Sequence, residues 1–190
     1  RLAADLKTRT NGPYHFAKAA YDYVLDHTDY VSPSPSHGAR ECFLKGQADC
    51  GSYAMLFVAL CRAGGVPARP VAGCWALGEN QWHCWAEFLL PGVGWIPVDP
   101  ADVRKVVLEE EGGVPLDHAK SKLARARLFG NWEMNWMAYN NAGDTRLAPP
   151  TSKPLGHFMY PHGESAAKGT LNRYDPASFR YKMTSKEVIA

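Results

Sequence analysis

The spacing of apolar residues predicts two helices in the first third of the chain. Over residues 14–27, apolar side chains recur every three to four positions, which is the period of an amphipathic helix. Asn11 is a good N-cap for it, and Pro13 lies just inside its first turn. A second helix is expected over residues 50–62, begun by Asp49 or a neighbour and ended by a glycine pair. The interior of this second segment carries no charge, so it should be buried on nearly every side.

After the second helix, the pattern changes to runs that are typical of strands. Three strands are expected at residues 68–77, 81–90 and 95–98. The second and third are joined by a Pro-Gly-Val-Gly hairpin signal. Weaker patterns predict an exposed loop at 32–38, an irregular segment at 102–116, and further strands at 132–139, 156–160 and 179–183. Helices followed by an antiparallel sheet indicate an α+β fold, which we expect to form one catalytic domain over residues 1–190.

Composition and charge narrow the class of protein. Hydrophobic residues make up 46% of the chain and charged residues 21%, which argues against intrinsic disorder. The net charge is +2 without long blocks of one sign, so neither a nucleic-acid surface nor a polybasic membrane patch is indicated. The longest apolar run, residues 54–60, is too short to span a bilayer. The basic residues Lys120, Lys122, Arg125 and Arg127 are expected to form a solvated face.

The chain begins at Arg1 without a signal-peptide pattern, so we expect a processed form or a fragment. Its location stays open between the bacterial cytoplasm and a secreted or periplasmic compartment. Its oligomeric state stays open as well.

Three residues can together perform nucleophilic catalysis. Cys50 is expected at the start of the buried helix, where unpaired N–H groups and the helix dipole favour a thiolate. His83 lies near the start of an apolar strand, and Asp99 follows the hairpin, where it could orient the imidazole. Taken singly, each has a structural alternative: a core thiol, a hydrogen-bonded core histidine and a turn aspartate before proline. In the order Cys, His, Asp they supply the nucleophile, base and orienting group of acyl transfer.

The residues around these three positions resemble a known family. Residues 46–54 (GQADCGSYA) and 60–69 (LCRAGGVPAR) are similar to the cysteine-helix segment of the transglutaminase-like superfamily. Residues 83–88 (HCWAEF) and 94–100 (GWIPVDP) are similar to its histidine and aspartate segments. The order and the local residues both match, over residues 41–101.

This resemblance implies a papain-like fold, in which a central helix bearing the nucleophile packs on an antiparallel sheet bearing histidine and aspartate. By position, it makes Cys50 the nucleophile, His83 the general base and then acid, and Asp99 the orienting group, with an acyl-thioester intermediate. Residues 129–161 are similar to the later part of bacterial members. No cofactor is implied. A calcium-dependent, tissue-type transglutaminase is not expected, because ligand-rich loops are absent from the sequence.

Three further residues are candidates for the surroundings of the site. Gln47 could add a side-chain amide to an oxyanion hole formed by the backbone N–H of Cys50, although a turn or capping role is equally compatible with its position. Trp82 and Trp85 are candidates for the wall of a substrate cleft because they flank His83. Packing in the core and sheet is the alternative for both tryptophans.

The five cysteines cannot all pair, so at least one thiol must be free in a monomer. Cys61 lies about 16 Å along the helix from Cys50, which is too far for a disulfide. Cys74 and Cys84 could pair if their strands are adjacent, and are otherwise core thiols. No metal site is expected, because no Cys-x-x-Cys pair is present.

The sequence therefore predicts a cysteine-dependent acyl-transfer enzyme whose partner is a peptide or protein substrate. We expect water to resolve the thioester, which makes the protein a peptidase or amidase. A transglutaminase or amide ligase with an amine acceptor is the alternative reaction, since the triad is common to both. A non-catalytic protein-binding domain on the same fold is the alternative from another class.

Overall fold

The computed structural model divides the chain into two units. The first consists of Arg1–Val71 and Cys84–Glu133, and the second of Ala72–His83 and Met134–Ala190. The structure describes residues 1–34, 37–76, 82–109, 114–131, 135–141, 143–153, 155–157, 160–172 and 175–184. The single catalytic domain over residues 1–190 stays a prediction.

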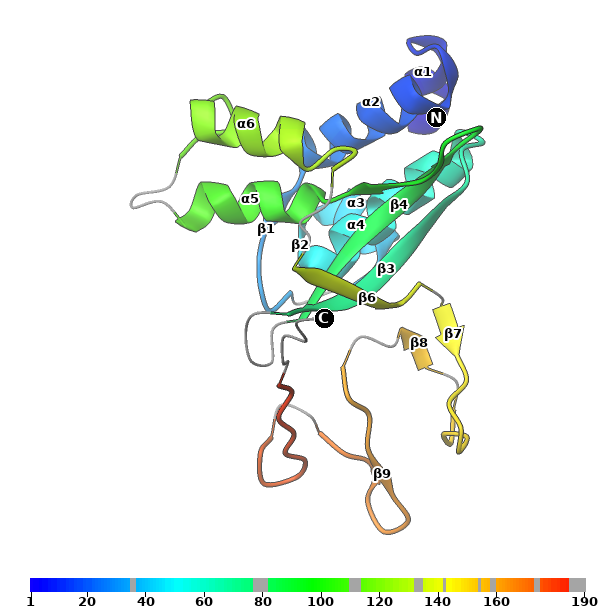
Figure 1. Cartoon of the computed structure of the whole chain (residues 1–190), viewed down its shortest axis with the longest axis vertical. Coiled ribbons are helices and arrows are strands. Elements are labelled where there is room, and N and C mark those ends of the chain that lie inside the picture. Colours follow the sequence, from blue (N-terminus) through cyan, green and yellow to red (C-terminus); the bar gives the residue numbers. More distant parts are fainter. Residues whose placement is uncertain are drawn as a thin grey trace, which may run out of the picture. The chain divides into compact units, whose positions relative to one another are not determined.

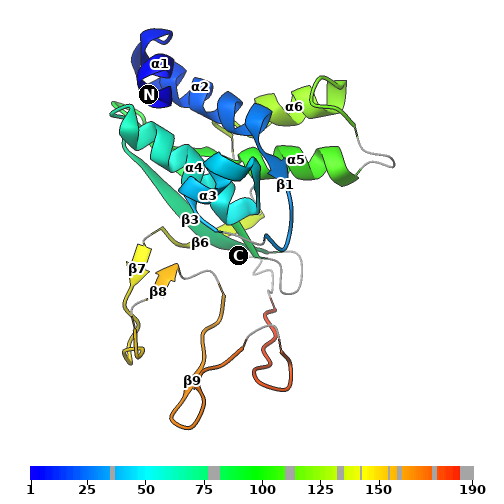
Figure 2. The same cartoon turned by 180° about the vertical axis from the view of Figure 1, so that it is seen from behind.

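Helices form most of the described part of the first unit (Figure 1). Helix α4 (Cys50–Ala63) is central among them, because it contacts four other helices, α1, α2, α3 and α5. Figure 2 shows α3 beside α4 from behind. The other helices are α1 (Leu2–Thr8), α2 (Gly12–His27), α3 (Ala39–Lys45), α5 (Pro100–Glu109) and α6 (Ala119–Arg127).

The uncharged interior of α4, residues 51–61, is largely buried, as expected. Nine of the fourteen residues of the helix are buried, including Tyr53 and Phe57, which are completely inaccessible. The ring of Phe57 meets the ring of Phe88 in the sheet edge to face, with centroids 6.4 Å apart. The mixed fold, in which the cysteine-bearing helix packs on an antiparallel sheet, is therefore confirmed.

Helix α2 also begins as predicted, with Asn11 as its N-cap and a proline in its first turn. It packs against α4 so closely that the ring of Phe16 lies over Gly64, the C-cap of α4. A Cβ atom on Gly64 would lie only 2.0 Å from Cζ of Phe16. The glycine therefore ends α4 and also allows the two helices to approach.

The structure contains the three strands predicted at residues 68–77, 81–90 and 95–98, of which residues 77 and 81 lie outside the described part of the chain. Strands β3 (Ala68–Trp75), β4 (Trp82–Leu90) and β5 (Gly94–Val98) belong to a sheet of order β5-β4-β3-β6. β4 and β5 form the expected antiparallel hairpin, in which Ala86 pairs with Val98. A separate parallel pair, β1 (Asp29–Tyr30) and β2 (Gln47–Ala48), leads the chain into the start of α4.

The second unit contains short antiparallel pairs. Strand β6 (Trp136–Asn140) pairs with the later residues of β3, so a strand is present within the predicted 132–139 segment. The predicted strand at 179–183 is wrong: these residues form no strand, and the ring of Tyr181 packs 6.0 Å from that of Trp82 instead of entering a ladder. The remaining pairs are β7 (Gly143–Thr145) with β8 (Leu155–His157) and β9 (Glu164–Ser165) with β10 (Gly169–Thr170).

The irregular segment predicted for residues 102–116 is wrong over residues 102–109, which belong to α5, whereas residues 110–113 lie outside the described residues and 114–116 are irregular. Asp99 caps this helix: its Oδ1 accepts a hydrogen bond of 3.1 Å from the backbone N–H of Asp102. Pro100 is the first helical residue, and Ala101 and Val103 are fully buried. The Asp-Pro pair was therefore a helix-start signal.

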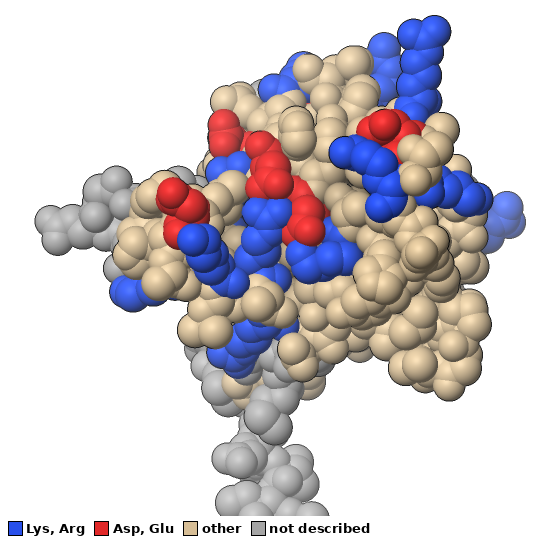
Figure 3. Space-filling model, turned by 90° about the horizontal axis from the view of Figure 1, so that it is seen from above, with Lys and Arg blue, Asp and Glu red and all other residues tan. Residues whose placement is uncertain are grey.

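The basic cluster at residues 120–127 lies on α6, and part of it is tied to α2. Arg125 forms ion pairs with Asp22, at 2.8 Å, and with Asp26, at 2.6 Å. Lys120, Lys122 and Arg127 are exposed, as expected for a solvated face. On the face seen from above, basic and acidic side chains lie next to one another and part of the surface carries no charge (Figure 3). Among the described residues, no helix combines the length and hydropathy needed to cross a membrane.

Candidate active site

Cys50 is the first residue of α4, as the sequence predicted. The carboxylate of Asp49 caps the helix by accepting a 3.0 Å hydrogen bond from the backbone N–H of Ser52. The thiol therefore lies where the helix dipole and the unpaired N–H groups of the first turn favour negative charge. Cys50 is 9% exposed, which leaves its side chain limited access to solvent.

In the first unit, Cys50 interacts electrostatically with a cation, the ammonium group of Lys105. Lys105, on α5, forms a 2.5 Å ion pair with Asp102, and its ammonium lies 5.8 Å from the ring centroid of Tyr30. Burial lowers the pKa of Lys105, but the charges of Asp102 and Asp99 outweigh it and raise that pKa overall. Burial and the negative charge of Cys50 raise the pKa of Tyr30. At neutral pH the surroundings of the thiol therefore hold a protonated lysine and a neutral tyrosine, and the lysine stabilises a thiolate.

A second thiol, that of Cys84, contacts Cys50, and this contact was not predicted from the sequence. Cys84 is 1% exposed, and a side-chain hydrogen bond joins it to Cys50. This hydrogen bond, burial and the charge of Cys50 together raise the pKa of Cys84 well above its ordinary value. Cys84 therefore stays protonated and is the donor of the pair. The sequence placed Cys84 in a predicted strand, where side chains alternate between the two faces of the sheet. It did not show which group the Cys84 thiol would contact.

Asp99 is buried in the first unit, with 2% of its surface exposed. It follows β5 directly, and its backbone N–H donates a 2.9 Å hydrogen bond to the carbonyl of Leu128. As described above, Oδ1 also caps α5. The main chain of Asp99 is therefore held by Leu128, and one carboxylate oxygen is held by the first turn of α5.

His83 belongs to the second unit, where it is the last residue of Ala72–His83. It is the second residue of β4, is completely buried, and its ring lies 4.9 Å from the ring of Trp136. Cys50 and Asp99 are thus in the first unit, and His83 is in the second, joined by its peptide bond to Cys84. The assembly of the three groups into a triad stays a prediction.

The three peripheral candidates are in different environments. Gln47 is exposed in β2, three residues before Cys50. Trp85 is 1% exposed, so its ring is part of the packed interior. Trp82 is half-buried in the second unit among the rings of Tyr139, Tyr160 and Tyr181. An oxyanion role for Gln47 and a cleft role for either tryptophan stay predictions.

None of the five cysteines is in a disulfide, so the Cys74–Cys84 bridge considered from the sequence is not present. Cys84 hydrogen-bonds Cys50 instead. Burial raises the pKa of Cys42 to about 11 and that of Cys61 to about 12, and it also raises the pKa of Cys74. These thiols therefore stay protonated at neutral pH and are poor nucleophiles compared with a thiol at a helix start.

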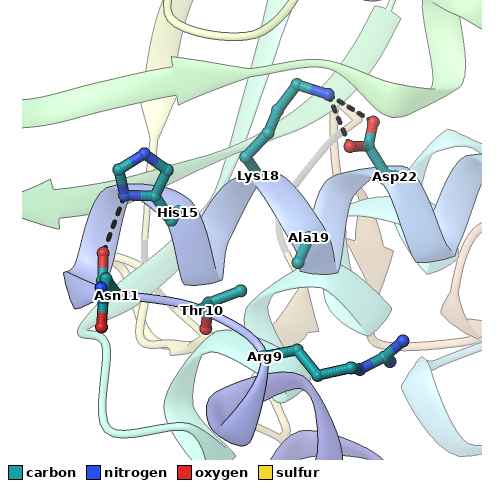
Figure 4. Close-up of a pocket in the computed structure, with 7 residues that line it drawn as sticks. All are labelled: Arg9, Thr10, Asn11, His15, Lys18, Ala19 and Asp22. Carbon is teal, nitrogen blue, oxygen red and sulfur yellow. Dashed lines mark hydrogen bonds and ion pairs between the residues drawn. The ribbon is translucent and has the colours of Figure 1, made fainter.

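A groove of about 440 Å³ lies at the junction of α1 and α2 in the first unit (Figure 4). Its charged side chains are already paired: Arg9 with Asp5 at 2.6 Å, and Lys18 with Asp22 at 2.5 Å. None of the residues that line it is a candidate catalytic residue. It is lined by Arg9, Thr10, Asn11, His15, Lys18, Ala19 and Asp22.

The sequence model of the transglutaminase-like superfamily matches residues 1–100 of the chain, more than half of its length. The chain belongs to this superfamily. The matched range of the transglutaminase-like model includes Cys50, His83 and Asp99.

A relative of the chain is an uncharacterized protein of Haemophilus influenzae, which is 37% identical over 170 residues. The match covers 76% of this chain and 44% of the relative, so the transglutaminase-like chain spans less than half of that protein's length.

Solved structures are also similar to this transglutaminase-like chain. One is a proposed cysteine protease from Cytophaga hutchinsonii, with 27% identity, coverage of 73% of this chain and 47% of that chain, and a TM-score of 0.48. The periplasmic domain of TgpA from Pseudomonas aeruginosa has 27% identity, coverage of 60% and 46%, and a TM-score of 0.48. LapG from Legionella pneumophila has 16% identity, coverage of 67% and 86%, and a TM-score of 0.43. Membership of the family rests on the sequence match and not on these likenesses.

Proposed function

We propose that the chain is a cysteine-dependent acyl-transfer enzyme that cleaves amides of peptides or proteins through an acyl-thioester. The observation that carries this proposal is the position of Cys50 at the capped start of a central helix, within the family match. Of the five thiols, it is the one with a helix dipole, a cap and a nearby ammonium group to stabilise its anion.

In the proposed reaction, the Cys50 sulfur attacks the amide carbonyl and forms a tetrahedral intermediate. His83 takes the thiol proton and then gives it to the leaving amine, and Asp99 holds the imidazole in one tautomer. The burial of both His83 and Asp99 supports this pairing, because a buried carboxylate and imidazole need charged or hydrogen-bonded partners. The backbone N–H of Cys50, at the helix start, would stabilise the oxyanion, with the Gln47 amide as a second donor.

Water is the proposed second nucleophile, which makes the protein a peptidase or amidase. An amine acceptor would use the same thioester but would need a channel that excludes water. The alternative outcomes, a transglutaminase or amide ligase and a non-catalytic protein-binding domain, are separated by the two experiments below.

The first experiment tests the reactive thiol. Iodoacetamide at pH 7 should alkylate one thiol rapidly, and mass mapping should place it at Cys50. Cys50→Ala should remove the fast phase, and His83→Ala should slow it. Cys61→Ala is the matched control, since it removes a buried thiol of the same helix and should leave the fast phase intact. Equal, slow labelling of all five cysteines would contradict the enzymatic proposal and support a binding domain.

The second experiment identifies the acceptor. A glutamine-containing peptide is incubated with the protein and an excess of a primary amine, and the products are weighed by mass spectrometry. Ammonia release or peptide fragments without amine incorporation would support hydrolysis. Amine-linked product alone would overturn the preference for water and favour a transglutaminase or ligase.

A further inference from the structure

Two thiols from different elements meet at the start of α4. Cys50 is the first residue of this helix, and Cys84 is the third residue of β4. Both belong to the first unit, and a side-chain hydrogen bond joins their sulfur atoms. To form a disulfide, the two sulfur atoms would have to move from hydrogen-bond contact to a bond length of about 2 Å.

The two thiols are not equivalent. Cys50 is 9% exposed and lies at a helix N-terminus, whereas Cys84 is 1% exposed. An oxidant from solvent therefore reaches Cys50 first, and the thiolate favoured there is the form that reacts. The hydrogen bond with Cys50, burial and the charge of Cys50 raise the pKa of Cys84, so this second thiol stays protonated.

We propose that Cys84 is a resolving thiol, which captures a peroxide-oxidised Cys50 as a reversible intramolecular disulfide. This modification uses the same Cys50 thiol as the proposed function, but its chemistry does not require acyl transfer. It gives Cys84 a role of its own, separate from packing and from the triad.

The chemistry balances with hydrogen peroxide as the oxidant. The Cys50 thiolate attacks one peroxide oxygen, the O–O bond breaks, and a sulfenic acid and hydroxide form. The Cys84 sulfur then attacks the sulfenic sulfur, so that an S–S bond forms and the S–O bond breaks. The departing hydroxide takes the proton of Cys84 and leaves as water. The hydroxide of the first step takes up the proton that Cys50 lost on forming its thiolate. In total, two thiols are oxidised to one disulfide, and one peroxide is reduced to two waters.

The disulfide would prevent the Cys50 sulfur from acting as a nucleophile and would protect it from irreversible oxidation. A sulfenic acid that is not captured is oxidised further to a sulfinic acid, which thiol reductants do not reverse. A neighbouring resolving thiol prevents this loss, and a dithiol reductant then restores both sulfurs.

The test is peroxide oxidation of the reduced full chain, followed by intact mass and thiol counting under denaturing conditions. We expect a mass loss of about 2 Da, a fall of two in the thiol count, and full recovery of both with dithiothreitol. Trypsin leaves Cys50 with Cys61 on one peptide and Cys74 with Cys84 on another, because no lysine or arginine lies between the two cysteines of either pair. Chymotrypsin is therefore added to divide each pair, at Tyr53 and at Trp82, before the linked peptides are sequenced.

Two variants isolate the role of Cys84. Cys84→Ser keeps the size of the side chain and should give no loss of 2 Da, but a gain of about 32 Da at Cys50 that dithiothreitol does not reverse. Cys61→Ala removes another fully buried thiol and should retain the reversible disulfide. The peptide mapping of the unaltered chain decides the question even if Cys84→Ser does not fold.

Three results would overturn the proposal: a linked peptide pair other than Cys50 with Cys84, irreversible oxidation of the unaltered chain without disulfide, or an unchanged disulfide in Cys84→Ser. The amide-cleavage assay is run on the same reduced sample. Cleavage without disulfide formation would refute only the resolving thiol, whereas a disulfide without cleavage would refute only the proposed function.

Discussion

The close approach of α2 and α4 at Gly64 makes a sharp prediction about stability. Gly64 has φ of −84°, which alanine adopts without strain, so Gly64→Ala adds a methyl group and no backbone penalty. That methyl group would lie 2.0 Å from Cζ and 2.4 Å from Cε1 of Phe16. Carbon atoms in contact are normally about 3.5–4.0 Å apart, so the ring would have to withdraw by about 1.5 Å.

The size of the effect follows from the packing around Phe16. Its side chain is 2% exposed, so the ring cannot swing into solvent. Overpacking of this kind costs about 1–3 kcal/mol, and the higher helix propensity of alanine returns less than about 1 kcal/mol. We therefore expect Gly64→Ala to lower the free energy of unfolding by about 2 kcal/mol, which corresponds to a fall in Tm of about 4–8 °C.

Urea unfolding followed by circular dichroism measures this change, with Gly51→Ala as the matched control. Gly51 lies on the same helix, and a Cβ there would be 3.6 Å from Asp49 Oδ1, an ordinary contact. That variant should keep the stability of the parent or gain slightly. In a Phe16→Leu background, which removes the clashing ring atoms, Gly64→Ala should cost less than half as much. An unchanged unfolding midpoint, or an equal loss in both backgrounds, would refute the steric argument.

Three further predictions follow from the ionisable groups. Asp49→Ala should lower the free energy of unfolding by about 1 kcal/mol through loss of the α4 cap, whereas Asp49→Asn, which can still cap, should restore most of it in urea titrations. Because burial raises the pKa of Cys61 to about 12 from an ordinary 9.0, the unfolded chain loses that proton first. Stability should therefore fall by up to about 1.4 kcal/mol per pH unit as pH rises above 9, and Cys61→Ala should flatten this part of a stability–pH profile. Arg125→Ala should cost about 1 kcal/mol or less, and a salt titration should shrink that cost, because its pairs with Asp22 and Asp26 are partly exposed. A salt-independent loss would indicate that packing of the Arg125 stem matters more.

The central helix and the hairpin were predictable because their signals are local. The uncharged interior of α4, its Asp49 cap and its Gly64 end all lie within the segment itself. The same is true of the turn between β4 and β5. Such signals need no information about the rest of the chain.

Helix α5 and the Cys84 contact were missed for different reasons. In α5, Asp102, Arg104 and Lys105 obscure the apolar period, and the cap is the same Asp99 that was interpreted as a catalytic residue. The pairing of Cys84 with Cys50 joins residues far apart in the chain. Strand alternation shows that a side chain faces one side of a sheet, but not which helix start it will meet there.

The capping role of Asp99 has a consequence for how relatives of this chain are compared. Its carboxylate holds the first turn of α5 whether or not it also serves His83. Natural selection on the stability of that turn would retain an aspartate even in a relative that has lost all chemistry. An aspartate at this position therefore says little about catalysis. The cysteine at the start of α4 is the informative marker, because Asp49 caps that helix without any help from a thiol.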